Sequence, residues 1–191
     1  HTRHARIVVL KALITKFKAH EACYTSRDFK EFHTRMVFLD PLMRILGWDS
    51  LNQAGAPLYA QDSIPEAQLR VAGLNGIDRY ADYGFRIDNH TRFYMEAKRP
   101  QRPIDQPELV YQAKRYGWGG GEAIAILSDF ETFRVYDTRM RPKLEKPEAG
   151  ELKEFSMNYF EYEEKFDLLY KTFSKEAVAK GSLEKLLKGR N

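Results

Sequence analysis

Residues 80–100 constrain the fold more than any other stretch, because apolar and polar side chains alternate along two runs separated by a turn. The first run covers residues 81–88 and the second covers residues 92–98, and in both runs the alternating apolar residues have odd numbers. Alternation with a period of two is typical of a strand with one buried face. The Asp-Asn-His-Thr sequence between the runs is typical of a turn. The stretch therefore predicts a β-hairpin.

The register of this hairpin follows from which side chains must share a face. Directly opposed residues in an antiparallel pair lie on the same face. Both odd-numbered apolar sets reach one core only if the numbers of opposed residues have an even sum, which requires a three-residue loop or a bulge near the turn. A sum of 178 places Asp82 opposite Glu96, and a sum of 180 places Asp82 opposite Lys98. Either register brings these three side chains together on one face.

Two carboxylates and an ammonium group at this spacing suit a site for a divalent cation. Carboxylate oxygens are hard ligands of the kind that Mg²⁺ binds, with Mn²⁺ as a substitute. A divalent cation polarises a phosphate and lowers the pKa of a water molecule. The ammonium of Lys98 would orient that water or stabilise charge on the phosphate. The alternative interpretation is a solvated strand face with a cross-strand ion pair.

Length, charge and cysteine content limit the class of protein. The 191 residues suffice for one domain, with or without a docking extension. The net charge is +4, and residues 151–191 contain eight basic and eight acidic residues, so the whole excess lies in residues 1–150. This excess permits a nucleic-acid partner. The single cysteine, Cys23, excludes an intrachain disulfide and a zinc site built from cysteines, and it fits a reducing compartment.

The pattern of apolar residues predicts neither a membrane span nor a signal peptide. No apolar run reaches the ~20 residues of a membrane span, and the first residues do not form a signal peptide. We therefore expect no membrane partner.

Helical and strand patterns alternate along the rest of the chain. Helices are expected over residues 5–20, 27–39, 41–46, 105–116 and, with a break near Gly181, 159–189. Strands are expected over residues 66–72, 123–127 and 132–136. Pro41 separates the second helix from the third, and Gly117 ends the fourth. The order predicts an α/β fold with a mixed central sheet flanked by helices, divided into a core domain over residues 1–150 and a helical extension over residues 151–191.

The residues of the predicted hairpin site resemble those of a known family. Asp82, followed by Glu96, Ala97 and Lys98 on the next strand, resembles the D…ExK core of the PD-(D/E)XK nucleases, the restriction-endonuclease-like superfamily. The chain departs from the motif at Ala81, where the motif has proline, but this position supplies no ligand.

Three further segments strengthen the resemblance, and they occur in the expected order. Gln112 and Tyr116 resemble the QxxxY element of a subset of these nucleases. Glu31 within KEFHTRMVFLDPLMRILGW resembles the helical glutamate that opens the nuclease domains of type I restriction subunits and of fused type IIG restriction-modification enzymes. The tail FDLLYKTFSKEAVAKGSLEKLL is similar to the segment that follows the type IIG nuclease domain and leads, through a helical connector, to an adenine-type DNA methyltransferase.

The resemblance implies a Mg²⁺-dependent DNA endonuclease domain of a restriction-modification enzyme, which hydrolyses phosphodiester bonds with a water activated by the metal. It assigns the metal ligands to four residues, namely Asp82, Glu96, Glu31 and, through its backbone carbonyl, Ala97. Lys98 would help to activate the water. Gln112 and Tyr116 would support the site or contact the DNA backbone.

The implied partner is double-stranded DNA. Four basic residues close to the site in sequence would contact its phosphates, namely Arg99, Arg102, Lys114 and Arg115. The alternative for each is ordinary surface charge. In a longer polypeptide, methyltransferase and target-recognition domains would be covalently linked, and the setting would be the cytoplasm of a bacterium or archaeon. A transient dimer for double-strand cleavage is left open.

Two other interpretations are also open. One is a catalytically silent module of the same fold for DNA binding or assembly, which the complete set of acidic residues, lysine and glutamine argues against. The other is a nuclease of a type I restriction or repair complex. The Phe-Ser-Lys-Glu-Ala-Val sequence in the tail favours the fused type IIG arrangement over a repair nuclease and over a type I complex.

Overall fold

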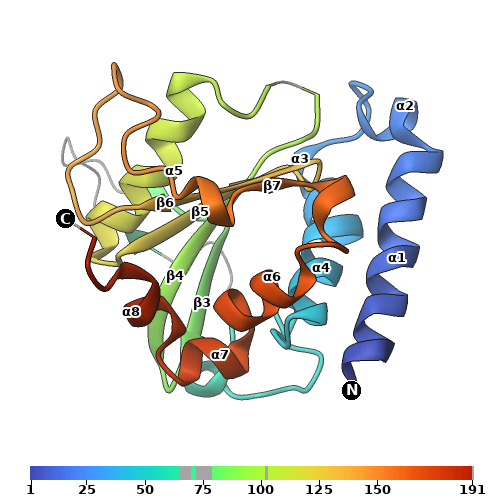
Figure 1. Cartoon of the computed structure of the whole chain (residues 1–191), viewed down its shortest axis with the longest axis horizontal. Helices are drawn as coiled ribbons and strands as arrows, with labels where there is room; N and C mark the ends of the chain where they lie inside the picture. The colour runs from blue at the N-terminus through green and yellow to red at the C-terminus, as the bar shows by residue number, and fades with distance from the viewer. Residues whose placement is uncertain (65–69, 72–78, 102, 191) are drawn as a thin grey trace.

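A mixed β-sheet lies between helices and gives the protein an α/β architecture (Figure 1). The computed structural model describes residues 1–64, 70–71, 79–101 and 103–190. Among these residues, five strands form one sheet in the order β3-β4-β5-β6-β7. Strands β4 and β5 are parallel, and the other neighbouring pairs are antiparallel. The predicted fold class is confirmed.

The elements have the following bounds. The large sheet consists of β3 (Tyr83–Ile87), β4 (His90–Ala97), β5 (Ile124–Ser128), β6 (Thr132–Asp137) and β7 (Met157–Asn158). A separate pair consists of β1 (Arg70–Val71) and β2 (Arg79–Tyr80). The α-helices are α1 (Arg3–Ala19), α2 (Glu21–Tyr24), α3 (Glu31–Thr34), α4 (Asp40–Ile45), α5 (Pro107–Gly120), α6 (Phe166–Phe173), α7 (Lys175–Ala179) and α8 (Ser182–Leu187). None of the helices in the described residues combines the length and the apolar content needed to cross a membrane.

One expected element lies partly outside the described residues. The strand predicted over residues 66–72 is realised at residues 70–71, and its other positions lie outside the described residues. Strands β5 and β6 occupy the positions expected for them to within one residue.

Strands β3 and β4 form the predicted hairpin, and the register with the sum of 178 is the one observed. Phe85 is opposite Phe93, and a bulge follows Phe85. Beyond the bulge the chain turns through Asp88 and Asn89, whose φ angles are 51° and 66°. Positive φ at both central residues is the geometry of a tight two-residue hairpin turn. The even sum thus arises from the expected bulge, because the bulge restores the register that a two-residue loop would otherwise shift.

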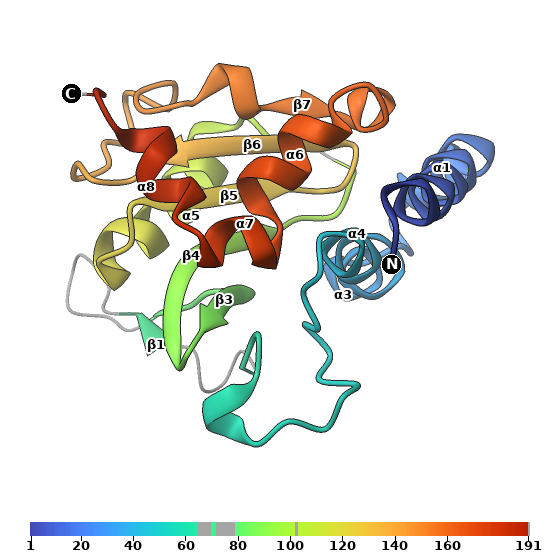
Figure 2. The ribbon, with the colours of Figure 1, turned by 60° about the horizontal axis from the view of Figure 1, so that its bottom comes forward.

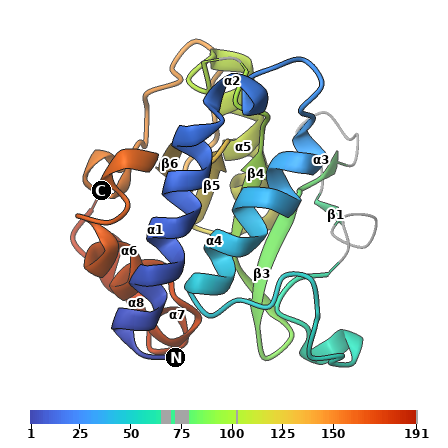
Figure 3. The ribbon, with the colours of Figure 1, turned by 90° about the vertical axis from the view of Figure 1, so that its right-hand side faces the viewer.

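Both faces of the hairpin are buried, which corrects the expectation of one solvated face. The face with Phe85, Phe93 and Met95 belongs to the main core, which also contains residues of α1, α4 and the C-terminal helices. Figure 3 shows α1 and the α3–α4 region on this side of the strands, with α5 behind the sheet. Tyr94 faces the opposite way and packs with Tyr116 of α5. The even-numbered carboxylates of Asp82 and Glu96 are buried and therefore do not face open solvent.

The chain stays helical from α3 through α4, because a π-helical segment, Arg35–Leu39, joins the two. The predicted break at Asp40 is therefore wrong. The predicted start at Arg27 is also wrong, because the helix begins at Glu31. In an α-helix the ring of Pro41 would clash with the carbonyl four residues earlier. The wider π turn just before Pro41 accommodates that ring without ending the helix.

Helix α5 continues one turn beyond its predicted end and stops at Gly121, whose φ is 76°. The glycines within this last turn let the helix approach the sheet closely. A Cβ atom at Gly117 would lie 2.2 Å from Oγ1 of Thr138, and one at Gly120 would lie 2.5 Å from the ring of Tyr94. Close packing, rather than chain reversal, therefore explains these two glycines.

The predicted C-terminal extension packs on the same core as the sheet. Figure 2 shows α6, α7 and α8 lying alongside the strands, and β7 is the edge strand next to β6. The indole Nε1 of Trp48 donates to the carbonyl of Phe173 at 2.8 Å. The N–H of Lys175 donates to the carbonyl of Leu46 at 2.9 Å. That residues 151–191 lead into a further domain stays a prediction.

Candidate metal centre

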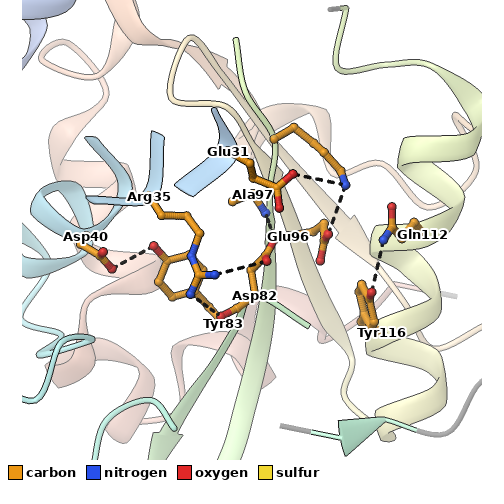
Figure 4. A network of polar contacts seen from close by, with 10 residues as sticks. Glu31, Arg35, Asp40, Asp82, Tyr83, Glu96, Ala97, Gln112 and Tyr116 are labelled. Atoms are coloured by element: carbon orange, nitrogen blue, oxygen red, sulfur yellow. Dashed lines mark hydrogen bonds and ion pairs between the residues drawn. The ribbon is translucent and has the colours of Figure 1, made fainter. Parts of the chain in front are cut away.

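Three acidic side chains from separate elements converge near the end of β4 (Figure 4). Glu31 begins α3, Asp82 immediately precedes β3, and Glu96 lies one residue before the end of β4. One carboxylate oxygen of each residue lies within 4.8 Å of the others. The hairpin register sets Asp82 across from Glu96, and α3 adds Glu31 from outside the sheet. The structure thus brings together the three acidic residues selected from the sequence.

Burial gives Glu96 an unusual environment for a carboxylate. Glu96 and Asp82 are each only 4% exposed. Burial raises the pKa of Glu96 well above its usual value, the Asp82 carboxylate raises it further, and Lys98 opposes both effects. Within the described residues, Oε2 of Glu96 is buried and accepts no hydrogen bond. Such an oxygen is costly to bury, so a cluster of hard oxygen donors with one unsatisfied member fits a cation such as Mg²⁺.

Lys98 neutralises part of the acidic cluster. Its Nζ lies 3.3 Å from Oε1 of Glu96 and 3.8 Å from Oε2 of Glu31. Burial by itself lowers the pKa of Lys98, but the carboxylates of Glu96 and Glu31 outweigh it, so the pKa is raised. The ammonium of Lys98 is therefore available as a hydrogen-bond donor beside these carboxylates.

Asp82 is held from two directions. The N–H of Ala97 donates to Oδ2 of Asp82 at 2.7 Å. The guanidinium of Arg35 lies 3.5 Å from Oδ1 and donates to the backbone carbonyl of Asp82 at 3.2 Å. The observed contact of Ala97 uses its N–H, and the predicted role of its carbonyl as a metal ligand stays a prediction.

Arg35 is in turn supported by a buried tyrosine. Its guanidinium carbon lies 4.8 Å from the ring centre of Tyr83, and the Tyr83 hydroxyl donates to Oδ1 of Asp40 at 2.8 Å. Burial raises the pKa of Tyr83, and the Asp40 carboxylate raises it further. The Tyr83 hydroxyl therefore keeps its proton and remains a donor.

Gln112 and Tyr116 approach the cluster from α5, and in Figure 4 they lie on the opposite side of Glu96 from Asp82. Nε2 of Gln112 donates to the Tyr116 hydroxyl at 3.3 Å. Burial raises the pKa of Tyr116, and the nearby Glu96 carboxylate raises it further. A spacing of four residues places both side chains on one face of the helix. The two residues of the QxxxY pattern thus lie at the site.

One of the four basic residues predicted to contact DNA lies beside the cluster. Arg99 lines a cavity of about 430 Å³ together with Lys30, Glu31, Lys98 and Leu109. This cavity opens next to the carboxylates and has three basic residues in its wall. Basic side chains of this kind suit contacts with a phosphate group.

Of the other three basic residues predicted to contact DNA, Lys114 is 4% exposed. Its Nζ donates to the carbonyls of Lys146 and Ala149 at 3.2 Å and 2.6 Å. The prediction that Lys114 contacts phosphate is therefore wrong, because its ammonium is buried under the loop after β6. Arg115 is partly buried, 5.8 Å from the ring of Tyr111. Arg102 lies outside the described residues.

Two residues of the site were not selected from the sequence. Arg35 follows Glu31 by four positions, so helical periodicity would have placed it on the same face. Lys30 precedes Glu31 and lines the same cavity, but a lone lysine at a helix start carries no distinguishing signal.

The chain is similar to part of a known enzyme. It is 33% identical over 177 residues to the type II restriction enzyme and methyltransferase RM.Eco57I of Escherichia coli. The match covers 92% of this chain and 17% of the relative, so the chain spans less than a fifth of that protein. No family model matches the chain, and no solved structure matches it.

Proposed function

We propose that the chain is a Mg²⁺-dependent DNA endonuclease domain of the PD-(D/E)XK type, belonging to a restriction-modification enzyme. The convergence of Glu31, Asp82 and Glu96 within 4.8 Å is the observation that carries the proposal. The contacts of Lys98 with two of these carboxylates support it. The identity of 33% to a protein named as a restriction enzyme and methyltransferase supports it independently.

The carboxylates of Asp82, Glu96 and Glu31 would hold the cation, with the carbonyl of Ala97 as a further ligand. When bound, a divalent cation supplies Lewis acidity, which polarises the scissile phosphate and favours ionisation of a nearby water. Because Asp82 and Glu96 are buried, their charges act through a medium of lower dielectric constant than water, which strengthens their interaction with a cation.

Lys98 would act from its protonated state. Hydrogen bonds from its ammonium would orient the attacking water opposite the leaving oxygen, and its charge would offset the negative charge that builds on the phosphoryl oxygens. Glu31 and Glu96 hold this ammonium at the edge of the cluster, 3.8 Å and 3.3 Å away.

The substrate would be double-stranded DNA, bound through its phosphates. Arg99 and Lys30 line the cavity beside the carboxylates, and Gln112 with Tyr116 closes the opposite side of Glu96. Phosphate contacts position DNA but carry no sequence information. We expect weak, salt-dependent binding by this chain, with target recognition and methylation performed by linked domains of a type IIG enzyme.

Cleavage of supercoiled plasmid in the presence of Mg²⁺ or Mn²⁺ tests this function. Lys98→Ala should lower the cleavage rate at least 100-fold, since removal of one group that stabilises a transition state costs about 10²–10³ in rate. Lys165→Ala is the matched control, because Lys165 is also ion-paired and partly buried but lies 2.8 Å from Glu161. Circular dichroism melting should show both variants folded.

Three results would separate the alternatives. Full activity of Lys98→Ala would remove the role given to that residue. DNA binding by the unmodified chain without cleavage in either metal would favour the silent module. Cleavage that requires ATP and partner subunits would favour a type I complex.

A further inference from the structure

Asp82 lies at the end of the hairpin, where individual contacts orient its side chain. Strand β3 begins at Tyr83, so Asp82 lies just outside the ladder of the hairpin. Its carboxylate must nevertheless point at Glu96 for the two groups to share a cation. The N–H of Ala97 restrains Oδ2, and a contact at Oδ1 adds a further restraint on the carboxylate.

Arg35 provides that restraint. Its guanidinium contacts both Oδ1 and the backbone carbonyl of Asp82, so it ties the side chain to the main chain of the same residue. A planar guanidinium with several donors suits this double contact, whereas a lysine ammonium is a point charge. With Oδ2 bound by Ala97, both carboxylate oxygens of Asp82 are then directed.

Arg35 does not depend on Asp82 alone for its own placement. It stacks over the ring of Tyr83, which is buried and anchored by its hydroxyl to Asp40. Ser50 donates to the same Oδ1 of Asp40 at 2.7 Å. A connected set of buried contacts therefore runs from α4 through Tyr83 to the guanidinium.

The location of Arg35 on its helix adds a second link to the site. Arg35 follows Glu31 by one helical turn and begins the π segment. The same helix therefore carries Glu31, which belongs to the cluster, and Arg35, which contacts the carboxylate of Asp82. A shift of this helix would move both.

We infer that Arg35 is a positioning residue, which fixes the orientation in which Asp82 meets Glu96, with Tyr83 and Asp40 holding Arg35 in place. Its effect on cleavage rests on the proposed nuclease function. Its effect on Asp82 belongs to the protein without metal or DNA and can be measured there.

A contact with DNA phosphate is the competing role for an arginine at this site. The side chain of Arg35 is 25% exposed, and its guanidinium lies against the Asp82 carboxylate and the Tyr83 ring. A positioning role affects the chemical step, whereas a phosphate contact affects DNA binding. Replacement of Arg35 should therefore lower kcat and leave KM for DNA within about twofold.

The backbone amide of Ala97 reports directly on Asp82, because it donates to Oδ2. Hydrogen exchange of this amide, followed by NMR on the 191-residue chain without metal, should accelerate at least tenfold in Arg35→Gln. The adjacent amide of Lys98 donates to the carbonyl of Ser128 at 3.0 Å, so it is the internal control and should not change. Loss of a group that orients a metal ligand typically costs 10–100-fold, and we expect that fall in kcat.

Two variants complete the design. Arg92→Gln is the matched control, since the Arg92 side chain is 27% exposed and pairs with Glu184 at 3.1 Å, away from the cluster. It should leave both amides and the cleavage rate within twofold of the unmodified chain. Arg35→Lys keeps the positive charge and should restore part of the protection of Ala97. If Arg35→Gln fails to fold, the same exchange measurement on Arg35→Lys decides.

The outcomes are distinct. Unchanged exchange of the Ala97 amide in a folded Arg35 variant would overturn the inference, and so would a loss confined to KM for DNA. If the unmodified chain does not cleave DNA but the Ala97 amide still loses protection in Arg35→Gln, the proposed function fails and the positioning role stands.

Discussion

The ammonium of Lys98, directly after β4, lies 3.8 Å from the carboxylate of Glu31 at the start of α3. This contact joins a helix from the first part of the chain to the hairpin that carries the other charged residues. Glu31 therefore belongs to the same electrostatic unit as Glu96 and Asp82, and replacing any one of them changes the surroundings of the rest.

Replacing Glu31 with glutamine should weaken the site without destroying it. The change removes one of three clustered carboxylates and one of the partners of Lys98. We expect a 10–100-fold loss of Mg²⁺-dependent cleavage, smaller than the loss from Glu96→Gln, because Glu31 is more exposed. Glu163→Gln is the control, since Glu163 is also a half-exposed, lysine-paired glutamate. Equal rates for the two variants would remove Glu31 from the site.

Divalent cations should raise the thermal stability of the protein. Three carboxylates that repel each other are held together in the folded chain, and a cation that binds only there adds about 2.7 kcal/mol at a concentration of 100 Kd. For a chain of this size we expect Tm to rise by about 5–10 °C. Glu96→Gln should abolish most of the rise, whereas Glu151→Gln, at a partly buried glutamate paired with Arg134, should retain it. Scanning calorimetry with Mg²⁺ and with EDTA measures both.

Asp129 should make stability depend on pH. Burial raises its pKa to about 7, so between the unfolded value near 4 and pH 7 the folded chain binds the proton more tightly. The contribution of this proton binding to the free energy of unfolding is fully present below pH 4. It decreases as pH rises and is lost above pH 7. Asp129→Asn keeps an acceptor for the Thr132 N–H, which donates to Oδ1 at 2.7 Å. Relative to the unmodified chain, it should gain on the order of 2–4 kcal/mol between pH 4 and pH 7.5.

Urea unfolding at several pH values checks this prediction. The stability difference between Asp129→Asn and the unmodified chain should grow with pH and then level off above pH 7.5. A difference that is the same at pH 5 and pH 8 would show that Asp129 has an ordinary pKa.

Alanine at Gly117 should destabilise the fold, although alanine is the better helix former by about 1 kcal/mol. The added Cβ would lie 2.2 Å from Oγ1 of Thr138, so α5 would have to move off the sheet. We expect a loss of about 1–3 kcal/mol in the free energy of unfolding. The double variant with Thr138→Ala should recover part of it, because two of the three clashing atoms are removed. A Gly117→Ala chain as stable as the original would show that the helix can shift freely.

Much of the fold could be predicted because local patterns and tertiary structure agree. Alternation in the hairpin led to the correct register, since a shift by one residue would have turned either Phe85 or Phe93 away from the main core. The errors occurred where tertiary contacts override local preference. Gly117 breaks helices in isolation but allows close packing here, and Pro41 is tolerated because the preceding turn widens.

The candidate site could be predicted to a similar extent. Asp82, Glu96 and Lys98 follow from one strand register, so their proximity needed no distant information. Lys114 was misplaced because neighbouring residues on a helix point in different directions, and closeness in sequence does not indicate which one faces the site. Arg35 could have been found from its spacing to Glu31. Its hydrogen bond to the carbonyl of Asp82, however, depends on how the helix docks against the hairpin.

The packing of the C-terminal helices against the first helices has a consequence for how the protein is made. Arg3 pairs with Asp167 at 2.7 Å, and Trp48 and Leu46 bond to residues that follow position 170. During synthesis every residue of the acidic cluster leaves the ribosome before these partners exist. Contacts between such distant parts of a chain form slowly, and domains tend to fold as units. The α3–α4 helix that carries Glu31 should therefore dock late, so that the nascent chain completes the acidic cluster only after α6 and α7 have emerged.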